Sequence, residues 1–327
     1  MKERILIVSL SGGLGNQLFQ VFAAHHFSSN AQILVESDSH KPQRDSKQNL
    51  LVEDFTILSD INSIKASPFP LFIQKIASLN LRSSLNENKN FARWFNRLSS
   101  ETLLKTFLLF RYKRFFKLLT PTTVDAFPES HGIRSLYLNG YFQNKISVST
   151  TSSIKLMDEI SLKKPDYEIQ SWILRAKELS PAVIHYRLGD YRSHPGMGVL
   201  DVAYFKKAIA KIRVSRPDVE VWVFSDEPRV AYALLRASGI THLREIPEFP
   251  PGETMELMRY GSAYVISNST FSWWGAVLKY DKSAAVWAPR PWFKSQRSPE
   301  ALYDENWHLV AAWENISSGD TTEELEE

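Results

Sequence analysis

Short apolar runs that end in polar or glycine-rich turns predict strands along this chain, and apolar residues at helical spacing between them predict helices. Near the amino terminus, strands at 5–10 and 32–36 flank a helix from about Asn16 to Phe27, which is a βαβ pattern. The second half is more regular, with strands at 181–186, 221–225, 243–246, 263–267 and 284–288 that alternate with helices at 202–214, 228–238, 252–260 and 271–279. This alternation predicts an α/β protein whose parallel sheets carry helices on both faces.

The region between these two parts, about 60–120, is irregular and rich in predicted helix. Its segment 103–119 mixes lysines and arginines with aromatic residues. Two interpretations are open for this segment. It is either a helix lying on an anionic membrane surface with its basic side chains snorkelling, or a core helix whose charged residues line an exposed edge.

Two domains are expected. Ser147 to Ser153 and Lys163 to Pro165 have the composition of a linker or loop. They divide the chain into an N-terminal α/β domain at 1–155, which includes the helical insertion, and a C-terminal Rossmann-like domain at 156–316. The polar tail at 317–327 is expected to be disordered.

Composition narrows the class of protein. A chain of 327 residues with 43% hydrophobic residues suits two folded domains. The absence of cysteine excludes disulfides, a thiol nucleophile and a cysteine-ligated metal, and a reducing cytosol is the natural compartment. A net charge of +3 is too small to indicate nucleic-acid binding. Because no apolar run approaches the roughly 20 residues that span a bilayer, and the first strand is too short for a signal peptide, a soluble or peripheral protein is expected.

Three predicted strands are followed by polar or glycine-rich residues that suit the binding of an anionic ligand. The last runs into Ser267-Asn268-Ser269-Thr270 at the start of a helix, where free backbone N–H groups and hydroxyls can hold phosphate, although a plain N-cap is the alternative. The strand at 181–186 ends in His185, Arg187 and Asp190, with Gly189 freeing the backbone to turn. The first strand runs into Gly12-Gly13-Leu14-Gly15, whose spacing is not the dinucleotide fingerprint, because Leu18 stands where the third glycine belongs.

A resemblance to a known family rests on four segments taken in order. They are Gly12-Gly13-Leu14-Gly15-Asn16-Gln17-Leu18-Phe19-Gln20, His185-Tyr186-Arg187-Leu188-Gly189-Asp190-Tyr191, Phe224-Ser225-Asp226-Glu227 and Ser267-Asn268-Ser269-Thr270-Phe271-Ser272-Trp273-Trp274-Gly275-Ala276, with smaller echoes at Gly140-Tyr141-Phe142-Gln143 and Pro289-Arg290-Pro291-Trp292-Phe293. From its first strand to about Trp307, the chain resembles the α-1,2-fucosyltransferases of glycosyltransferase family 11.

The resemblance implies the GT-B architecture, in which two Rossmann-like domains face one another across a cleft. The C-terminal domain would hold most of the donor GDP-β-L-fucose, and the N-terminal domain would face a galactose-containing glycan acceptor. The implied reaction is inverting transfer of L-fucose to a galactoside hydroxyl with an α-1,2 linkage. The acceptor class would be a bacterial surface polysaccharide repeat, as in O-antigen biosynthesis, while it is still lipid-linked inside the cell. The enzyme would then be cytoplasmic or peripheral on the inner membrane.

Two other functions stay open at this point. One is a GT-B glycosyltransferase with another fucosyl linkage or another donor. The other is a catalytically silent glycan-binding protein that keeps the fold.

Arg187 is the candidate for charge neutralisation, because the sequence contains no Asp-x-Asp clamp for a metal-bound sugar nucleotide and no metal or other cofactor is expected. A guanidinium can bind phosphate oxygens in a bidentate manner, and the family gives its arginine that role. The alternative for Arg187 is a structural ion pair with Asp190. Asp190 is also a candidate catalytic base, although it could serve only to orient the arginine.

The remaining site residues are expected to bind substrate. In related folds the residues that correspond to His185 and Asp226 lie near the guanine or ribose, whereas here they could also be a packed core histidine and a helix cap. Asn16 and Gln17 resemble the Gly-Asn-Gln element that faces the cleft in the family, although Asn16 could also simply start the first helix. The further predicted substrate contacts are Gly13, Gly15, Ser267, Asn268, Ser269, Thr270 and Phe271, whereas Trp273 and Trp274 are expected to pack in the core.

Overall fold

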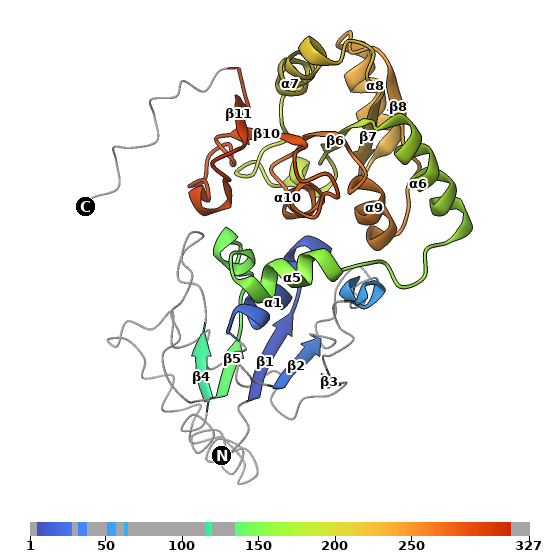
Figure 1. Cartoon of the computed structure of the whole chain (residues 1–327). Coiled ribbons are helices and arrows are strands. Elements are labelled where there is room, and N and C mark those ends of the chain that lie inside the picture. Colours follow the sequence, from blue (N-terminus) through green and yellow to red (C-terminus); the bar gives the residue numbers. More distant parts are fainter. Residues whose placement is uncertain are drawn as a thin grey trace, which may run out of the picture.

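The computed structural model describes residues 5–27, 32–37, 51–56, 62–64, 116–119 and 135–314, which form two α/β domains (Figure 1). The described strands of the N-terminal sheet are all parallel and lie in the order β3-β2-β1-β5-β4. Its elements are β1 (Ile5–Leu10), α1 (Leu14–Phe27), β2 (Gln32–Ser37), a 3-10 turn at Leu51–Asp54, β3 (Asn62–Ile64), β4 (Phe116–Leu119), β5 (Ser135–Leu138), a second 3-10 turn at Lys145–Val148 and α5 (Thr151–Glu159).

The C-terminal sheet is also parallel throughout its described strands, in the order β11-β10-β9-β6-β7-β8. Its elements are α6 (Tyr167–Leu179), β6 (Ala182–Tyr186), a 3-10 turn at Asp190–Ser193, α7 (Val202–Ser215), β7 (Val221–Ser225), α8 (Pro228–Ala237), β8 (Leu243–Glu245), α9 (Pro251–Met258), β9 (Ala263–Val265), α10 (Thr270–Val277), β10 (Ala285–Arg290), a 3-10 turn at Glu300–Leu302 and β11 (His308–Ala311). Numbered from β6, this is the strand order of the Rossmann fold. The predicted architecture of two Rossmann-like α/β domains is confirmed.

Several local predictions need correction. The ends of the predicted helical insertion are strands, β3 and β4, so the helix expected at 103–119 does not include its last four residues. The stretch Ser147 to Ser153 is not a linker, because Thr150 caps α5 there by accepting a hydrogen bond from the Ser153 amide at 3.2 Å. The chain passes between the domains after α5, at residues 160–166. Residues 103–115 and the tail at 317–327 lie outside the described residues.

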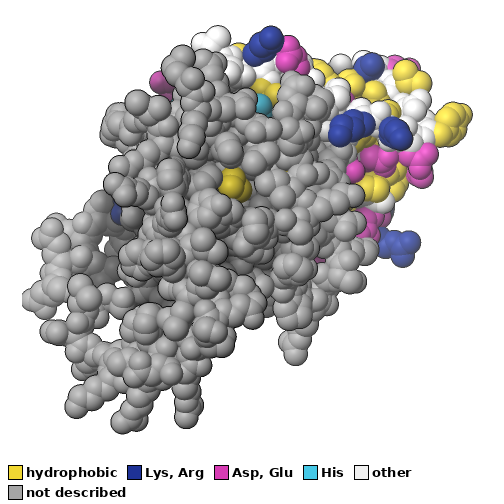
Figure 2. All heavy atoms as spheres, turned by 90° about the horizontal axis from the view of Figure 1, so that it is seen from below, with side chains coloured by type: hydrophobic (Ala, Val, Ile, Leu, Met, Phe, Trp, Pro, Cys, Tyr) yellow, Lys and Arg dark blue, Asp and Glu magenta, His cyan; other side chains and the backbone are white. Residues whose placement is uncertain are grey.

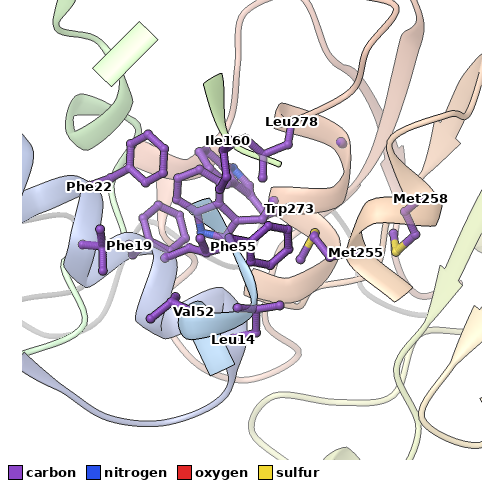
Figure 3. Close-up of a cluster of buried hydrophobic side chains, with 14 of the residues drawn as sticks. Leu14, Phe19, Phe22, Val52, Phe55, Ile160, Met255, Met258, Trp273 and Leu278 are labelled. Carbon is purple, nitrogen blue, oxygen red and sulfur yellow. The ribbon is translucent and has the colours of Figure 1, made fainter. Parts of the chain in front are cut away.

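One continuous hydrophobic core joins the two domains. Figure 3 shows Phe19 and Phe22 of α1 beside Trp273 of α10, with Val52 and Phe55 from the N-terminal half and Ile160, Met255, Met258 and Leu278 around them. The Phe19 ring lies 4.7 Å from the Trp273 ring and 5.0 Å from the Trp274 ring, centroid to centroid. Both tryptophans are buried, which confirms their predicted packing role. The domains therefore meet through α1 and α10, the helices that follow β1 and β9 (Figure 1).

A buried ion pair lies beside residues 160–166, the segment through which the chain passes from one domain to the other. Arg259 is 2% exposed and donates to the Glu256 carboxylate at 2.8 Å, to the Ile160 carbonyl at 2.9 Å and to the Leu278 carbonyl at 2.8 Å. Glu256 also accepts a hydrogen bond of 2.6 Å from the Tyr280 hydroxyl. Because Ile160 belongs to the crossing segment, this guanidinium ties that segment to the C-terminal domain.

None of the helices in the described part of the chain is long and apolar enough to cross a membrane. On the described part of the face in Figure 2, basic and acidic side chains are interspersed and do not gather by sign.

Candidate functional site

The order in which strands are added to the C-terminal sheet reverses between the neighbouring strands β6 and β9. The chain leaves β6 towards β7 on one side and leaves β9 towards β10 on the other, so the two following loops diverge and open a crevice at the carboxyl edge. Arg187 to Asp190 follow β6, and Ser267 to Thr270 follow β9. Ligands bind at such a switch point in open α/β sheets. The structure thus brings together two of the three segments that the sequence singled out.

Arg187 stands at this crevice with its side chain 30% exposed, between two carboxylates. Its Nη2 lies 2.8 Å and its Nε 2.9 Å from Asp190 Oδ1, and its Nη1 lies 3.4 Å from Asp226 Oδ2. The ion pair with Asp190, the alternative interpretation, is therefore present. Since the guanidinium is partly exposed and fixed on two sides, the same contacts also orient it towards the crevice.

Asp226 braces the turn after β6. Its Oδ1 accepts a hydrogen bond of 3.0 Å from the Leu188 amide. A Cβ at Gly189 would lie 2.4 Å from Asp226 Oδ2, so only glycine lets this turn approach the carboxylate so closely. The capping interpretation of Asp226 does not hold, because Glu227 is the residue at the N-cap of α8.

His185 lies in the interior, 4% exposed, with its Nδ1 3.1 Å from Ser267 Oγ and its ring 5.3 Å from the Phe271 ring. Burial, helped by the nearby positive charge of Arg187, lowers the pKa of His185 to about 3, while Asp226 acts in the opposite direction. The imidazole is neutral at physiological pH and holds the start of the polar turn.

The polar turn after β9 is mostly buried. The Ser267 amide donates to Ser272 Oγ at 2.9 Å, and Asn268 Nδ2 donates to the Met197 and Gly198 carbonyls at 3.0 Å each. Ser269 is the N-cap residue of α10, and Thr270 begins this helix. Hydrogen bonds thus fix the turn so that the first turn of α10, with its unsatisfied N–H groups, stands beside Arg187 and its loop.

Tyr191, for which the sequence predicted no role, connects the two loops of the crevice. Its hydroxyl donates to the Asn268 carbonyl at 2.9 Å, and the Arg187 guanidinium lies 5.7 Å from its ring centroid. Burial raises the pKa of Tyr191 to about 12, so the hydroxyl keeps its proton. The signal was present in the sequence, because Tyr191 ends the motif that contains Arg187.

The glycine-rich loop meets this crevice from the N-terminal domain. Asn16 Oδ1 accepts hydrogen bonds from Thr270 Oγ1 at 3.0 Å and from Gln143 Nε2 at 2.9 Å, which joins the two domains at the site. A Cβ at Gly15 would lie 2.5 Å from the Phe271 amide nitrogen, whereas around Gly13 no described heavy atom lies within 4 Å of the equivalent position. Gly15 is thus needed for the contact between the helices, and Gly13 leaves open space.

Gln17 does not face the crevice. It is 3% exposed, its Nε2 donates to the Gly12 carbonyl at 3.0 Å, and its Oε1 accepts from the Val52 amide at 3.3 Å. The structure therefore gives Gln17 a bracing position under the glycine-rich loop. Gln143, for which the sequence predicted no role, instead reaches the site through its hydrogen bond to Asn16.

A cavity of about 610 Å³ opens beside Asp226. Four of its eight lining residues carry carboxylates, and the lining consists of Asp226, Glu227, Pro228, Arg229, Val230, Glu245, Pro247 and Glu248. Arg192 Nη1 donates to Glu227 Oε1 at 2.6 Å and to Glu227 Oε2 at 2.7 Å. This pair connects the loop after β6 to the start of α8. The cavity continues the crevice along the carboxyl ends of β7 and β8.

In the described part of the chain, no group of three or more His, Asp or Glu side chains is arranged so that it could hold a metal ion. Metal-independent transfer stays a prediction.

Comparison with known proteins agrees with the motifs. The chain is 24% identical over 319 residues to the O-antigen biosynthesis glycosyltransferase WbnK of Escherichia coli, covering 90% of this chain and 97% of that protein. It is 32% identical over 139 residues to an alpha-1,2-colitosyltransferase of the same species, covering 38% of this chain and 47% of that protein.

Solved structures of similar architecture include the fucosyltransferase NodZ from Bradyrhizobium, with 16% identity and a TM-score of 0.46 over 85% of this chain and 94% of that chain. A FUT1 mutant of Arabidopsis thaliana in complex with GDP has 11% identity and a TM-score of 0.45 over 88% of this chain and 70% of that chain. Similarity at this level is too distant to transfer a donor, a linkage or an acceptor.

The sequence profile described as Glycosyl transferase family 11 matches residues 5–311, almost the whole of both domains. The resemblance read from the four motifs is thereby confirmed, and the chain is a glycosyltransferase that belongs to glycosyl transferase family 11.

Proposed function

We propose that the chain transfers L-fucose from GDP-β-L-fucose to a galactoside hydroxyl, with inversion and formation of an α-1,2 linkage. The acceptor is a galactose-containing repeat of a bacterial surface polysaccharide. The curated relative named for O-antigen biosynthesis, which aligns with nearly the whole chain, supports this acceptor class.

The observation that carries the proposal is the position of Arg187 beside the start of α10. In the reaction the bond from the fucose C1 to the β-phosphate oxygen breaks, and its electron pair stays on the diphosphate. In the proposal, the guanidinium and the N–H groups at the start of α10 stabilise that charge. Tyr191 supports their proximity, because the guanidinium lies 5.7 Å from its ring centroid and its hydroxyl donates to the Asn268 carbonyl at 2.9 Å. No cofactor or metal is part of the proposal.

The cavity beside Asp226 suits the nucleoside of the donor. Its volume of about 610 Å³ lies in the range of small-molecule sites. Guanine presents two neighbouring N–H donors on its Watson–Crick edge, and a carboxylate is the side chain that accepts both. Glu245, at the end of β8, and Glu248 supply carboxylates to the lining of this cavity.

Asp190 is the candidate to receive the acceptor proton, because it is 53% exposed and lies at the crevice. His185 is a poorer candidate, since it is buried behind Ser267. Asp190 already accepts from Arg187, so in this proposal it first orients the arginine and takes the proton only as the acceptor hydroxyl attacks.

A second donor is favoured by one observation, the relative named as a colitosyltransferase. Colitose is fucose without the 3-hydroxyl group, so both sugars would fit one crevice. Incubation of purified protein with GDP-fucose and GDP-colitose, each with lactose, N-acetyllactosamine and methyl β-galactoside, followed by linkage analysis, distinguishes the two. Binding of GDP without turnover of any donor would favour a catalytically silent glycan-binding protein.

Substitution of Arg187 tests the mechanism. Arg187→Lys should fail nearly as badly as Arg187→Ala, with turnover lowered about 10²–10³ fold, because an ammonium keeps the charge but not the planar fork. Arg213→Lys, in α7 and bonded to Thr241, is the matched control and should keep wild-type turnover. If Arg187→Lys folds and keeps more than about a tenth of wild-type turnover, Arg187 does not take part in the mechanism and only forms a structural ion pair with Asp190.

Peripheral contact with the inner membrane, through the basic and aromatic residues that precede β4 in the segment 103–119, is also part of the proposal. The protein should sediment with anionic liposomes at low salt and be released at high salt, where surface attraction is screened. Equal sedimentation with neutral liposomes would favour the core-helix interpretation.

A further inference from the structure

The loop Gly140-Tyr141-Phe142-Gln143 stands at the switch point of the N-terminal sheet. It follows β5, which pairs with β1 in parallel, so this loop and the glycine-rich loop after β1 leave the sheet next to each other at its carboxyl edge. Neighbouring loops at this place form a ligand crevice in open parallel sheets. The proposed function gives neither of these two loops a ligand.

Contacts hold this second loop in one conformation. Phe142 has φ 52°, in the left-handed region that a bulky residue seldom adopts, and its side chain is 1% exposed in the core. Such a backbone persists only where its surroundings fix it. Here the Gly140 carbonyl accepts from Gln20 Nε2 at 3.0 Å, and the Asn144 amide donates to the Phe142 carbonyl at 2.8 Å.

The fixed loop presents Tyr141 to solvent while Phe142 anchors it. Tyr141 is 47% exposed, although most large aromatic residues in the described part of the chain are buried, as Trp273 and Trp274 are. The ring flanks the glycine-rich loop, because a Cβ at Gly12 would lie 3.2 Å from Tyr141 Cε1. The same Cβ would lie 2.7 Å from Asn16 Nδ2, so the ring and the amide both lie close to one glycine.

The amide beside this ring is oriented as a donor. Asn16 Oδ1 already accepts from both Gln143 and Thr270, so the two N–H bonds on Asn16 Nδ2 are the group that it can offer to a ligand. An exposed aromatic face next to an amide donor matches a pyranose, which has an apolar face of C–H bonds and hydroxyl groups around its edge.

We propose that Tyr141 binds the acceptor, with its ring packed against the apolar face of a galactoside and with Asn16 Nδ2 donating to an oxygen of the same sugar. The inference rests on the proposed function in taking the acceptor to be a galactoside. It places the acceptor subsite on the N-terminal domain, next to Thr270 at the start of α10, where the leaving diphosphate is stabilised.

Tyr141→Ala and Tyr141→Phe test this subsite, with Tyr167→Ala on α6 as the control, because Tyr167 is an 84% exposed tyrosine away from the site. In Tyr141→Ala the KM for the galactoside should rise about 10-fold or more, since loss of an aromatic contact of this kind is worth about 1.4 kcal/mol. The KM for GDP-fucose and the acceptor-free hydrolysis of GDP-fucose should stay within about twofold. Tyr141→Phe should resemble the wild type, because the ring and not the hydroxyl makes the contact.

A Tyr141→Ala protein with an unchanged galactoside KM would overturn the inference, and so would an equal rise in the KM for GDP-fucose. A binding experiment separates this from failure of the proposed function. Saturation-transfer NMR with methyl β-galactoside and GDP requires no turnover, and its signal should fall in Tyr141→Ala but not in Tyr167→Ala. If the wild type turns over no GDP-fucose, the proposed donor is wrong, while equal signals in wild type and Tyr141→Ala, or none in the wild type, would refute the acceptor subsite.

Discussion

Replacement of Gly15 by alanine tests the contact between the two domains. An added Cβ would lie 2.5 Å from the Phe271 amide nitrogen and 2.5 Å from the Thr270 carbonyl carbon. Ordinary contacts between heavy atoms begin at about 3.5 Å, so α10 and α1 would have to separate by about 1 Å. The obstacle is backbone at the start of a buried helix, which cannot rotate away as a side chain could.

The expected cost follows from two opposing effects. Overpacking of a close-packed core destabilises by about 1–3 kcal/mol, and alanine in place of glycine in a helix returns at most about 1 kcal/mol. A net loss of about 1–2 kcal/mol lowers Tm by roughly 2–8 °C in a protein with domains of this size. Activity should fall further, about 100-fold, because a displacement of about 1 Å moves Thr270 away from Asn16 and separates the halves of the site.

Gly13→Ala is the matched control in the same loop. No described heavy atom lies within 4 Å of the position its Cβ would take, so Tm should not change. Differential scanning fluorimetry and circular dichroism measure both variants, and turnover of GDP-fucose with lactose measures the second effect. If Gly15→Ala melts within about 1 °C of the wild type, the tight contact between α1 and α10 is wrong.

Three more outcomes are expected. Because the pKa of His185 is lowered to about 3 in the folded state, the stability that its neutral form contributes is present above about pH 6.5 and is lost as pH falls, at up to ~1.4 kcal/mol per pH unit. In His185→Gln the free energy of unfolding in urea should therefore depend less on pH between about pH 4 and 6. The same pH dependence in wild type and variant would contradict this expectation. Arg259→Met should lower the free energy of unfolding by about 3–5 kcal/mol, because it leaves Glu256 buried without its cation. A loss below ~1 kcal/mol in chemical denaturation would show that this ion pair does not hold the segment between the domains. Transfer should persist in excess EDTA, and activity that vanishes with EDTA and returns with manganese would show that a metal is required.

Local sequence patterns were sufficient for most elements of the C-terminal domain. The predicted strands at 221–225 and 263–267 and the helices at 202–214 and 228–238 match β7, β9, α7 and α8 within about two residues at either end. Periodicity reports which side chains a segment buries, and buried segments are what strands and helices in a parallel sheet are made of. The same logic placed Arg187 and Ser267 to Thr270 at strand ends, and therefore in one crevice.

The local sequence did not predict the short strands β4 and β11. The residues of β4, Phe-Lys-Leu-Leu, continue an apolar and basic run that also suits a helix, and only pairing with β5 makes them a strand. β11 likewise exists through its pairing with β10. A strand of four residues has too few positions to establish a period, so its partner decides its conformation.

The sequence by itself determined the family, the α/β class and the position of Arg187 and of Ser267 to Thr270 at strand ends, because these depend on motifs and on the order of strands along the chain. Tertiary structure alone decided that Gln17 braces the loop from inside while Asn16 meets Thr270, 254 residues away, and that Tyr141 is exposed beside Gly12. Adjacent residues such as Asn16 and Gln17 share the same local signal but point in different directions from a helix. Which of them faces a ligand is fixed only when α1 packs against α10, a contact between distant segments that no local pattern records.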